Sequence, residues 1–154
     1  MKIVIASDSF KGSCTTLQVA DAVEKGIKRV VPDCEIVKIP VADGGEGTVD
    51  ALVIGTGGTY EQIDVKGPLG DIVKARFGLL EGDVAVIEMA EASGLTLIDK
   101  NKRNPLHTTT FGTGQMIREA MNKGCRKIYV GIGGSATNDG GAGMAQALGV
   151  SFKD

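Results

Sequence analysis

The hydrophobic pattern of the first third of the chain alternates between strand-like and helix-like periods. Lys2–Ala6 is a mostly apolar run of the kind that forms a buried parallel strand. Apolar residues then recur at helical spacing as far as Pro32, which predicts a helix over about 15–31. A second strand is predicted over Glu35–Ile39 and a short helix over Thr48–Ile54. The chain is therefore expected to open as two strand-loop-helix units.

A change of architecture is predicted near residues 60–80. Two strand-like segments, Tyr60–Val65 and Val73–Leu79, are joined through a Gly-Pro-Leu-Gly turn at 67–70, which favours antiparallel pairing. The pattern beyond them predicts a strand over Asp83–Met89, a helix over Gly114–Asn122, a strand over Lys127–Ile132 and a helix over Gly141–Leu148. These elements indicate an α/β fold. The last five residues resemble the start of one more strand, so we expect the chain to be the first part of a longer protein.

Composition narrows the classes of function. The chain has 17 Lys and Arg against 19 Asp and Glu, a net charge of −2, and no basic stripe that would neutralise a nucleic-acid backbone. No apolar run approaches the roughly 20 residues that span a bilayer, and the first ten residues lack the features of a signal peptide. We expect a cytoplasmic protein with neither a nucleic-acid nor a membrane partner.

Cysteine and histidine chemistry is not indicated. Cys14, Cys34 and Cys125 are widely spaced and form no C-x-x-C pair, so they predict neither a disulfide framework nor a zinc site. Cys34 and Cys125 are expected to be small, partly buried residues. His107 is the single histidine and is predicted to be a loop residue following Pro105.

Three loops that follow predicted strands and precede helices carry the candidate chemistry: Ser7–Ser13, Pro40–Thr48 and Gly131–Gly143. In open α/β sheets, ligands bind beyond the carboxyl ends of strands, where backbone amides and helix N-termini converge. Many of the 23 glycines lie in or beside these loops. Glycine there allows positive φ and lets backbone amides approach an anion closely.

Each of these loops also carries charged or amide side chains, namely Asp8 with Lys11, Asp43 with Glu46, and Asp139 beside Asn138. Carboxylates repel a bound phosphate unless a divalent cation lies between them, so the combination predicts Mg²⁺ and favours phosphoryl transfer. One acid would accept the proton of an attacking hydroxyl, and Lys11 would offset the charge of a transferred group or of a substrate carboxylate. Taken singly, any of these aspartates is better explained as a helix cap or turn former, but three such loops in one chain favour a functional role.

Familiar signatures of other nucleotide and hydrolase sites are missing. The sequence contains no G-x-x-x-x-G-K-[ST], so a P-loop is not predicted. Gly131–Ala136 fits the G-x-G-x-x-A dinucleotide pattern, but Thr137–Gly140 delays the helix that should begin there. Ser7 and Ser9 have neither a histidine base nor a G-x-S-x-G frame.

Five stretches resemble the bacterial glycerate kinases of the ATP-dependent glycerate 2-kinase type, in that family's order and spacing. They are SDSFKGS at 7–13, PVADGGEGT at 40–48, VIEMAEASGL at 86–95, RNPLHTTTFGTGQMI at 103–117 and GIGGSATNDGGAGMAQALGV at 131–150. The last stretch is long and unusual, which makes a chance match improbable. Cys14 after Ser13 departs from the family pattern outside the positions assigned to chemistry.

The resemblance implies phosphorylation of D-glycerate by ATP, with Mg²⁺, to a phosphoglycerate. It also implies a longer two-domain enzyme in which a flavodoxin-like domain is assembled from both ends of the polypeptide. Residues 1–70 would then be the first segment of that discontinuous domain, and residues 71–154 the beginning of an inserted mixed α/β domain. On this interpretation the chain alone is expected to be inactive as a kinase.

The resemblance assigns roles residue by residue. Catalytic roles are expected for Asp8, Lys11, Asp43 and Asp139, with Asp43 and Asp139 also as metal ligands. Substrate or nucleotide binding is expected from Ser9, Gly44, Gly45, Glu46, Gly133, Gly134, Ser135, Thr137 and Asn138. The segment from Thr108 to Gly114 either caps a helix or contacts phosphate, and capping is the preferred interpretation.

Two alternatives stay open at this point. One is a receiver-like or small-anion-binding module without catalysis, because acids at strand ends also suit phosphoacceptors. Its weakness is the loop at 131–143, for which a receiver has no use. The other is a kinase for a different hydroxy acid.

Overall fold

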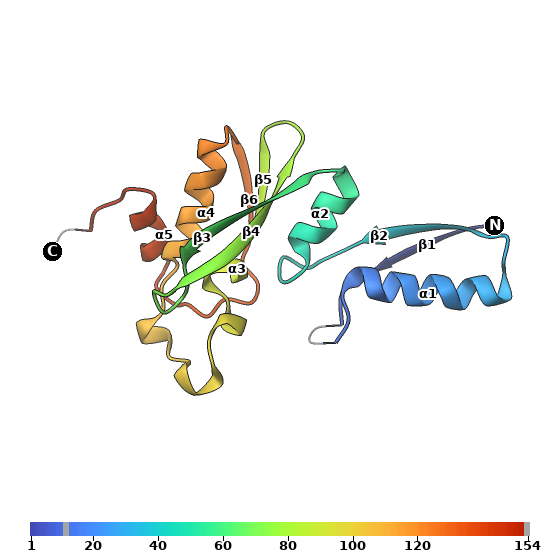
Figure 1. Ribbon diagram of the computed structural model, residues 1–154, viewed down its shortest axis with the longest axis horizontal. Coiled ribbons are helices and arrows are strands. Elements are labelled where there is room, and N and C mark those ends of the chain that lie inside the picture. The colour runs from blue at the N-terminus through green and yellow to red at the C-terminus, as the bar shows by residue number, and fades with distance from the viewer. Residues whose placement is uncertain (11–12, 153–154) are drawn as a thin grey trace.

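The computed structural model describes residues 1–10 and 13–152, which form an α/β structure with two separate sheets (Figure 1). The first sheet is a parallel pair near the N-terminus. The second has four strands of mixed direction. The predicted fold class is confirmed, including the change from parallel to antiparallel pairing.

The parallel pair follows the predicted pattern closely. Strand β1 (Lys2–Ser7) pairs in register with β2 (Glu35–Pro40), and α1 (Thr16–Val30) connects them. Helix α1 begins after Thr15, whose side chain accepts a hydrogen bond from the Gln18 amide while the Gln18 side chain accepts from the Thr15 amide. This capping box satisfies two backbone amides that would otherwise lack partners.

The four-stranded sheet has the order β3 (Thr59–Lys66), β4 (Ile72–Leu80), β5 (Val84–Glu88) and β6 (Lys127–Gly131). β3 and β4 are antiparallel along their whole length, as the turn at 67–70 predicted, whereas β5 and β6 are parallel. The boundary expected between residues 70 and 71 falls in the turn between two strands of one sheet. The chain passes from the first sheet to the second earlier, between β2 and β3, in the segment that contains α2 (Thr48–Thr56).

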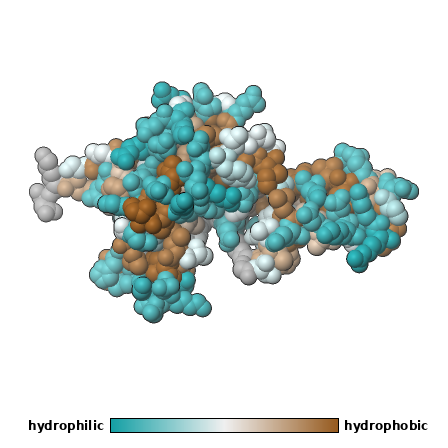
Figure 2. Space-filling view, in the orientation of Figure 1, coloured by the Kyte–Doolittle hydropathy of each residue, from teal (hydrophilic) through white to brown (hydrophobic). Residues whose placement is uncertain are grey.

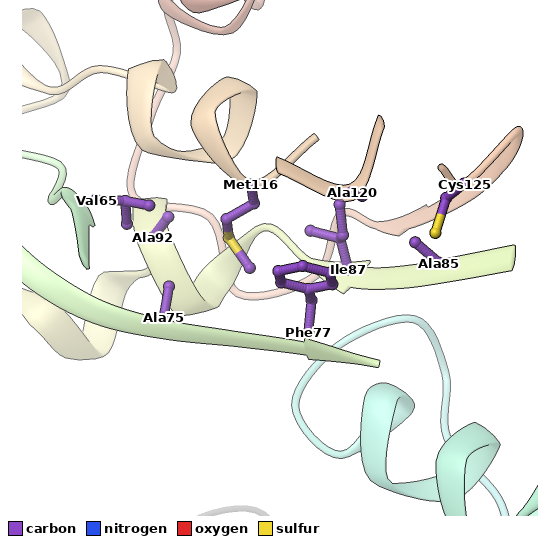
Figure 3. Packing of buried hydrophobic residues seen from close by; sticks show 9 residues of the cluster. All are labelled: Val65, Ala75, Phe77, Ala85, Ile87, Ala92, Met116, Ala120 and Cys125. Carbon is purple, nitrogen blue, oxygen red and sulfur yellow. The ribbon is translucent and has the colours of Figure 1, made fainter. Parts of the chain in front are cut away.

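Helices cover both faces of this sheet. Helix α4 (Phe111–Asn122) packs on one face, where Phe77 of β4 and Met116 of α4 are fully buried and lie close together (Figure 3). Along β5 the side chains alternate, so that Ala85 and Ile87 join this cluster while Val86 points to the opposite face. Full burial of an apolar side chain of this size stabilises the fold by about 1.5–3 kcal/mol.

Helix α2 occupies the opposite face of the four-stranded sheet. Its Val49 and Val53 are buried against Val86 and Leu80. Gly78 makes this approach possible, since a Cβ atom at that position would lie 2.5 Å from Cγ2 of Val53. The sequence placed this helix with the parallel strands, but its buried face packs on the second sheet.

The segment between β5 and α4 was only partly anticipated. It contains the one-turn helix α3 (Ala90–Ser93) and three short 3-10 turns at Leu95–Leu97, Lys100–Lys102 and Pro105–His107. Helix α4 begins three residues before the predicted start, and α5 (Ala142–Ala147) closes the described part. Residues 150–152 are in no strand, contrary to expectation. His107 is exposed at the end of the third of these turns, and Cys34 and Cys125 are free thiols that are more fully buried than expected.

Apolar side chains are exposed on both parts of the molecule, and brown patches interrupt the mostly teal surface (Figure 2). Val4 of β1 is 53% exposed and Tyr129 of β6 is 60% exposed. Within residues 1–10 and 13–152, no helix is long and apolar enough to cross a membrane.

The seating of α2 on Gly78 can be tested by substitution. We expect Gly78→Ala to lower the free energy of unfolding by about 1–3 kcal/mol, because Val53 is buried, β-branched and unable to move aside cheaply. Denaturant unfolding measures the change. Adding Val53→Ala should recover part of the loss by removing the clashing methyl group, and strictly additive effects would contradict the contact.

Gly26→Ala is the matched control. Gly26 lies within α1, and nothing stands within 4 Å of the position that a Cβ atom would occupy there. Alanine should therefore be neutral or stabilising, by up to about 1 kcal/mol, because it favours the helix.

Candidate functional site

A cavity of about 530 Å³ lies between the parallel pair and the four-stranded sheet. The start of α1, the loop before α2, and the strands β4 and β5 all contribute to its walls. Its lining residues are Ser9, Phe10, Ser13, Cys14, Thr15, Thr16, Leu17, Glu46, Gly47, Asp50, Arg76, Glu88 and Glu91. Two of the three predicted loops, 7–13 and 40–48, thus face one cavity.

The second and third predicted loops touch each other through glycine backbone. The Gly133 amide donates to the Gly44 carbonyl at 3.0 Å. A Cβ atom on Gly131 would lie 2.6 Å from the Gly44 oxygen, and one on Gly133 would lie 2.5 Å from Cα of Gly45. Side chains at these positions would separate the loops, so glycine is needed here for backbone packing.

Arg76 is the cation among the lining residues that the structure describes. Its guanidinium donates to Asp50 at 2.9 Å, and its backbone amide donates to Glu91 at 3.1 Å. The guanidinium also lies over the Tyr60 ring, 5.1 Å from the centroid. The Arg76 side chain is 42% exposed, so it remains accessible from the cavity while joining α2 to β4.

Glu88 is the buried acid of the cavity, 6% exposed at the carboxyl end of β5. Its Oε1 accepts a hydrogen bond from the Val49 amide at 2.7 Å. Helix α2 has Gly47 at its N-cap and no side-chain cap of its own, so Glu88 supplies that cap from a distant strand. Burial raises the pKa of the Glu88 carboxyl, which the Val49 amide opposes and the nearby Glu91 and Asp50 reinforce.

Asp139 lies in a different environment, at the junction of α4 and α5. Its two oxygens accept hydrogen bonds from the Thr110 amide and hydroxyl and from the amides of Gly141 and Gly143. Burial acts to raise the pKa of Asp139, but these donors outweigh it and lower the pKa below its ordinary value. The carboxylate therefore ties the 131–143 loop to the start of α4.

This environment does not fit Mg²⁺ at Asp139. A cation needs oxygen lone pairs, whereas N–H and O–H donors already point at both oxygens of this carboxylate. Within residues 1–10 and 13–152, no three His, Cys, Asp or Glu side chains are grouped to hold a metal ion. Asp43 belongs to no such group within the described residues either, so its metal role stays a prediction.

The glycerate kinase family model matches residues 3–154. The chain belongs to the glycerate kinase family. It is 59% identical over 150 residues to a glycerate kinase from Halalkalibacterium halodurans and 54% identical over 155 residues to a glycerate 2-kinase from Escherichia coli. These matches cover 96% and 100% of this chain.

A structural relative agrees with this assignment. A crystal structure described as a glycerate kinase 2 from Salmonella typhimurium LT2 matches with a TM-score of 0.85 and 54% identity, over 97% of this chain and 40% of that chain. The chain likewise spans 39% and 41% of the relatives from Halalkalibacterium halodurans and Escherichia coli. It corresponds to about two fifths of the length of these relatives.

The family motifs do not all reach the cavity. Ser9 and Glu46 line it, whereas Ser135, Thr137, Asn138 and Asp139 are not among its lining residues. Asp8 accepts the Ser9 amide at 2.6 Å, and Asp43 accepts the Gly45 amide at 3.0 Å, so both shape their own loops. Lys11 lies outside the described residues.

The remaining residues of the last motif make internal contacts. The Ser135 hydroxyl accepts the Thr137 amide at 3.0 Å, and Asn138 is exposed. Gly134 has a φ of +73°, and its carbonyl accepts the Leu95 amide. Upstream, the Thr108 hydroxyl donates to the Ala136 carbonyl. These hydrogen bonds hold the 131–143 loop against the segment that precedes α4.

Sequence reasoning missed Glu88, Arg76, Asp50 and Glu91 as cavity residues. Glu88 carried a readable signal, because it is a lone carboxylate ending the apolar run Val84–Ile87, and the family motif at 86–95 contains it. Arg76 carried none, since charged residues on a strand are usually solvated.

The hydrogen bonds to the Asp139 carboxylate predict that its substitution lowers stability, and that the loss depends on pH. The pKa of Asp139 is lower in the folded chain than the ordinary 3.8. Its stabilisation is therefore complete above the unfolded-state pKa and is lost as pH falls through the folded-state pKa. Asp139→Asn should lower the unfolding free energy by about 1–2 kcal/mol at neutral pH.

The difference in unfolding free energy between wild type and Asp139→Asn should become smaller in unfolding curves recorded below pH 3.8. Asp33→Asn, at an exposed position, is the control and should leave stability unchanged. A difference in unfolding free energy that is the same at all pH values would contradict a stabilising role for the charge of Asp139.

Proposed function

We propose that this chain provides part of the active site of an ATP-dependent glycerate kinase, which transfers the γ-phosphoryl group of ATP to a hydroxyl of D-glycerate. The observation that carries the proposal is the family match over residues 3–154 together with a cavity in which two of the family's motifs converge. The named relatives are described as glycerate kinases, and one as a glycerate 2-kinase.

The cavity has the chemistry that such a transfer requires. The first turn of α1 forms one wall with Thr16 and Leu17, and the first backbone amides of a helix attract phosphate oxygens. Hydroxyl groups of Ser9, Ser13 and Thr15 stand nearby and can hydrogen-bond a hydroxy acid. Arg76, which also pairs with Asp50, is proposed to contact a substrate carboxylate.

We also propose that the reaction uses Mg²⁺ and that Asp43 is its ligand in this chain. The ion would neutralise charge on the phosphates of ATP. Asp8, Ser9, Gly44, Gly45 and Glu46 are proposed to shape the substrate-facing side of the cavity. Gly133 and Gly134 are proposed to support that side from the third loop.

A kinase for another hydroxy acid is the second candidate. Hydroxyl-lined walls and one cation recognise any small hydroxy acid, so specificity must come from finer contacts. A non-catalytic anion-binding module is not favoured, because the cavity contains a buried acid as well as phosphate-binding elements.

A coupled assay for ADP release tests the proposed activity. The protein is expressed from its complete reading frame and supplied with ATP, Mg²⁺ and D-glycerate. We expect kcat/KM for D-glycerate to exceed that for lactate, which lacks one hydroxyl, by at least about 100-fold. ADP release that does not depend on any added hydroxy acid would contradict the proposal, and a higher kcat/KM for another acid would support the second candidate.

The Asp43 assignment makes a separate prediction. Asp43→Asn should lower kcat by about 100-fold or more, in the range of a lost catalytic group, with little change in unfolding free energy because the side chain is exposed. Asp139→Asn should show the opposite balance, with its main effect on stability. Near-normal turnover in Asp43→Asn would remove Asp43 from the site.

A further inference from the structure

Glu88 is the polar end of a strand that is otherwise apolar. β5 reads Val-Ala-Val-Ile-Glu, with Ala85 to Glu88 all buried. Glu88 also lines the cavity. A carboxylate is costly to bury without compensation. Packing alone therefore does not explain an acid at the carboxyl end of a central strand.

Within the described residues, only one oxygen of the Glu88 carboxylate accepts a hydrogen bond. Oε1 accepts the Val49 amide at 2.7 Å. In the described part of the chain, Oε2 has no hydrogen-bond partner, and it is not among the buried polar atoms that lack one. Because Oε1 is fixed by the start of α2 and Glu88 lines the cavity, Oε2 is the oxygen left to contact a molecule bound there.

The charged groups around Glu88 come from three elements. Glu91 belongs to α3, Asp50 to α2 and Arg76 to β4, and Glu46 lies on the loop before α2. Arg76 is engaged by Asp50 at 2.9 Å, so no cation is dedicated to Glu88 among the described lining residues. Burial with acids nearby raises the pKa of Glu88, which suits a group that must accept a proton near neutral pH.

We propose that Glu88 is the general base of the phosphoryl transfer, accepting the proton of the acceptor hydroxyl through Oε2. The inference rests on the proposed function. In the step, the hydroxyl oxygen forms a bond to the γ-phosphorus of the nucleoside triphosphate, and the bond from that phosphorus to the bridging oxygen breaks. The nucleoside diphosphate leaves with that electron pair, and the hydroxyl proton passes to Glu88.

The other acids are less well placed for this role. Both oxygens of Asp139 are occupied by donors, and Asp8 and Asp43 are not among the cavity-lining residues. Asp50 is paired with Arg76. Glu91 accepts the Arg76 backbone amide, and Glu46 is exposed. Glu88 combines burial, a fixed orientation and access to the cavity.

Glu88→Gln separates the catalytic role from the structural one. The glutamine carbonyl oxygen can still accept the Val49 amide, but the side chain can no longer take a proton. In the protein expressed from its complete reading frame, we expect kcat with D-glycerate to fall at least about 100-fold. KM and the unfolding midpoint should stay near wild-type values. Glu61→Gln, which removes an exposed partner of Lys123, is the matched control and should keep full activity.

The pH dependence gives a second readout. Because the base must be ionised, wild-type kcat should decline as pH falls through the raised pKa of Glu88, and this acidic limb should be absent in the residual activity of Glu88→Gln. Glu88→Asp keeps a carboxylate and should be more active than Glu88→Gln even if it is less stable.

Each outcome decides between the roles. If Glu88→Gln turns over within about threefold of wild type, far short of the loss expected for a general base, Glu88 is only the cap of α2 and the inference is overturned. If Glu88→Gln fails to fold, Glu88→Asp and the acidic limb of wild type are decisive, and loss of both activity and limb in Glu88→Asp overturns it. If wild type phosphorylates no hydroxy acid, the proposed function fails and the inference falls with it.

Discussion

The packing of α2 into the space above Gly78 joins the two sheets and determines where the cavity lies. A Cβ atom on residue 78 would lie 2.5 Å from Cγ2 of Val53, and the Val49 amide of the same helix donates to the Glu88 carboxylate. Apolar burial fixes the height of the helix above the sheet, and the charged hydrogen bond fixes its N-terminal end. Together these two contacts hold the loop that carries Glu46 and Gly47 near the carboxyl end of β5.

Much of this architecture is readable from the sequence because it depends on local periodicity. The apolar runs at β1 and β2, the helical spacing of α1 and the Gly-Pro-Leu-Gly turn each specify their element with neighbouring residues alone. The sheet on which α2 packs is not determined by neighbouring residues. The buried valines of α2 suit either sheet, and the choice depends on a glycine on β4 whose relevance emerges only after β3 and β4 have paired.

The candidate site divides in the same way. Glycine-rich loops after strands predicted a phosphate site; Ser9 and Glu46 line one cavity, and phosphate binding there stays a prediction. Gly131 and Gly133, however, serve the close approach of backbone at 44–45, and Asp139 receives donors from Thr110 and its own loop. Glycine and aspartate in a loop have identical sequence signals for binding an anion and for packing a turn. Only the identity of their neighbours distinguishes the two.

The chain crosses between the sheets once, and that crossing is short. The Val41 amide donates to the Ser7 carbonyl beside β1, while the Gly44 carbonyl is held by the amide of Gly133 on the other side. Ala42 and Asp43 lie between these two backbone hydrogen bonds, and the Asp43 carboxylate itself accepts the Gly45 amide. A rotation of one sheet relative to the other would change the backbone dihedrals of this short segment. The width of the cavity and the direction of the Asp43 side chain are consequently coupled through the same few bonds.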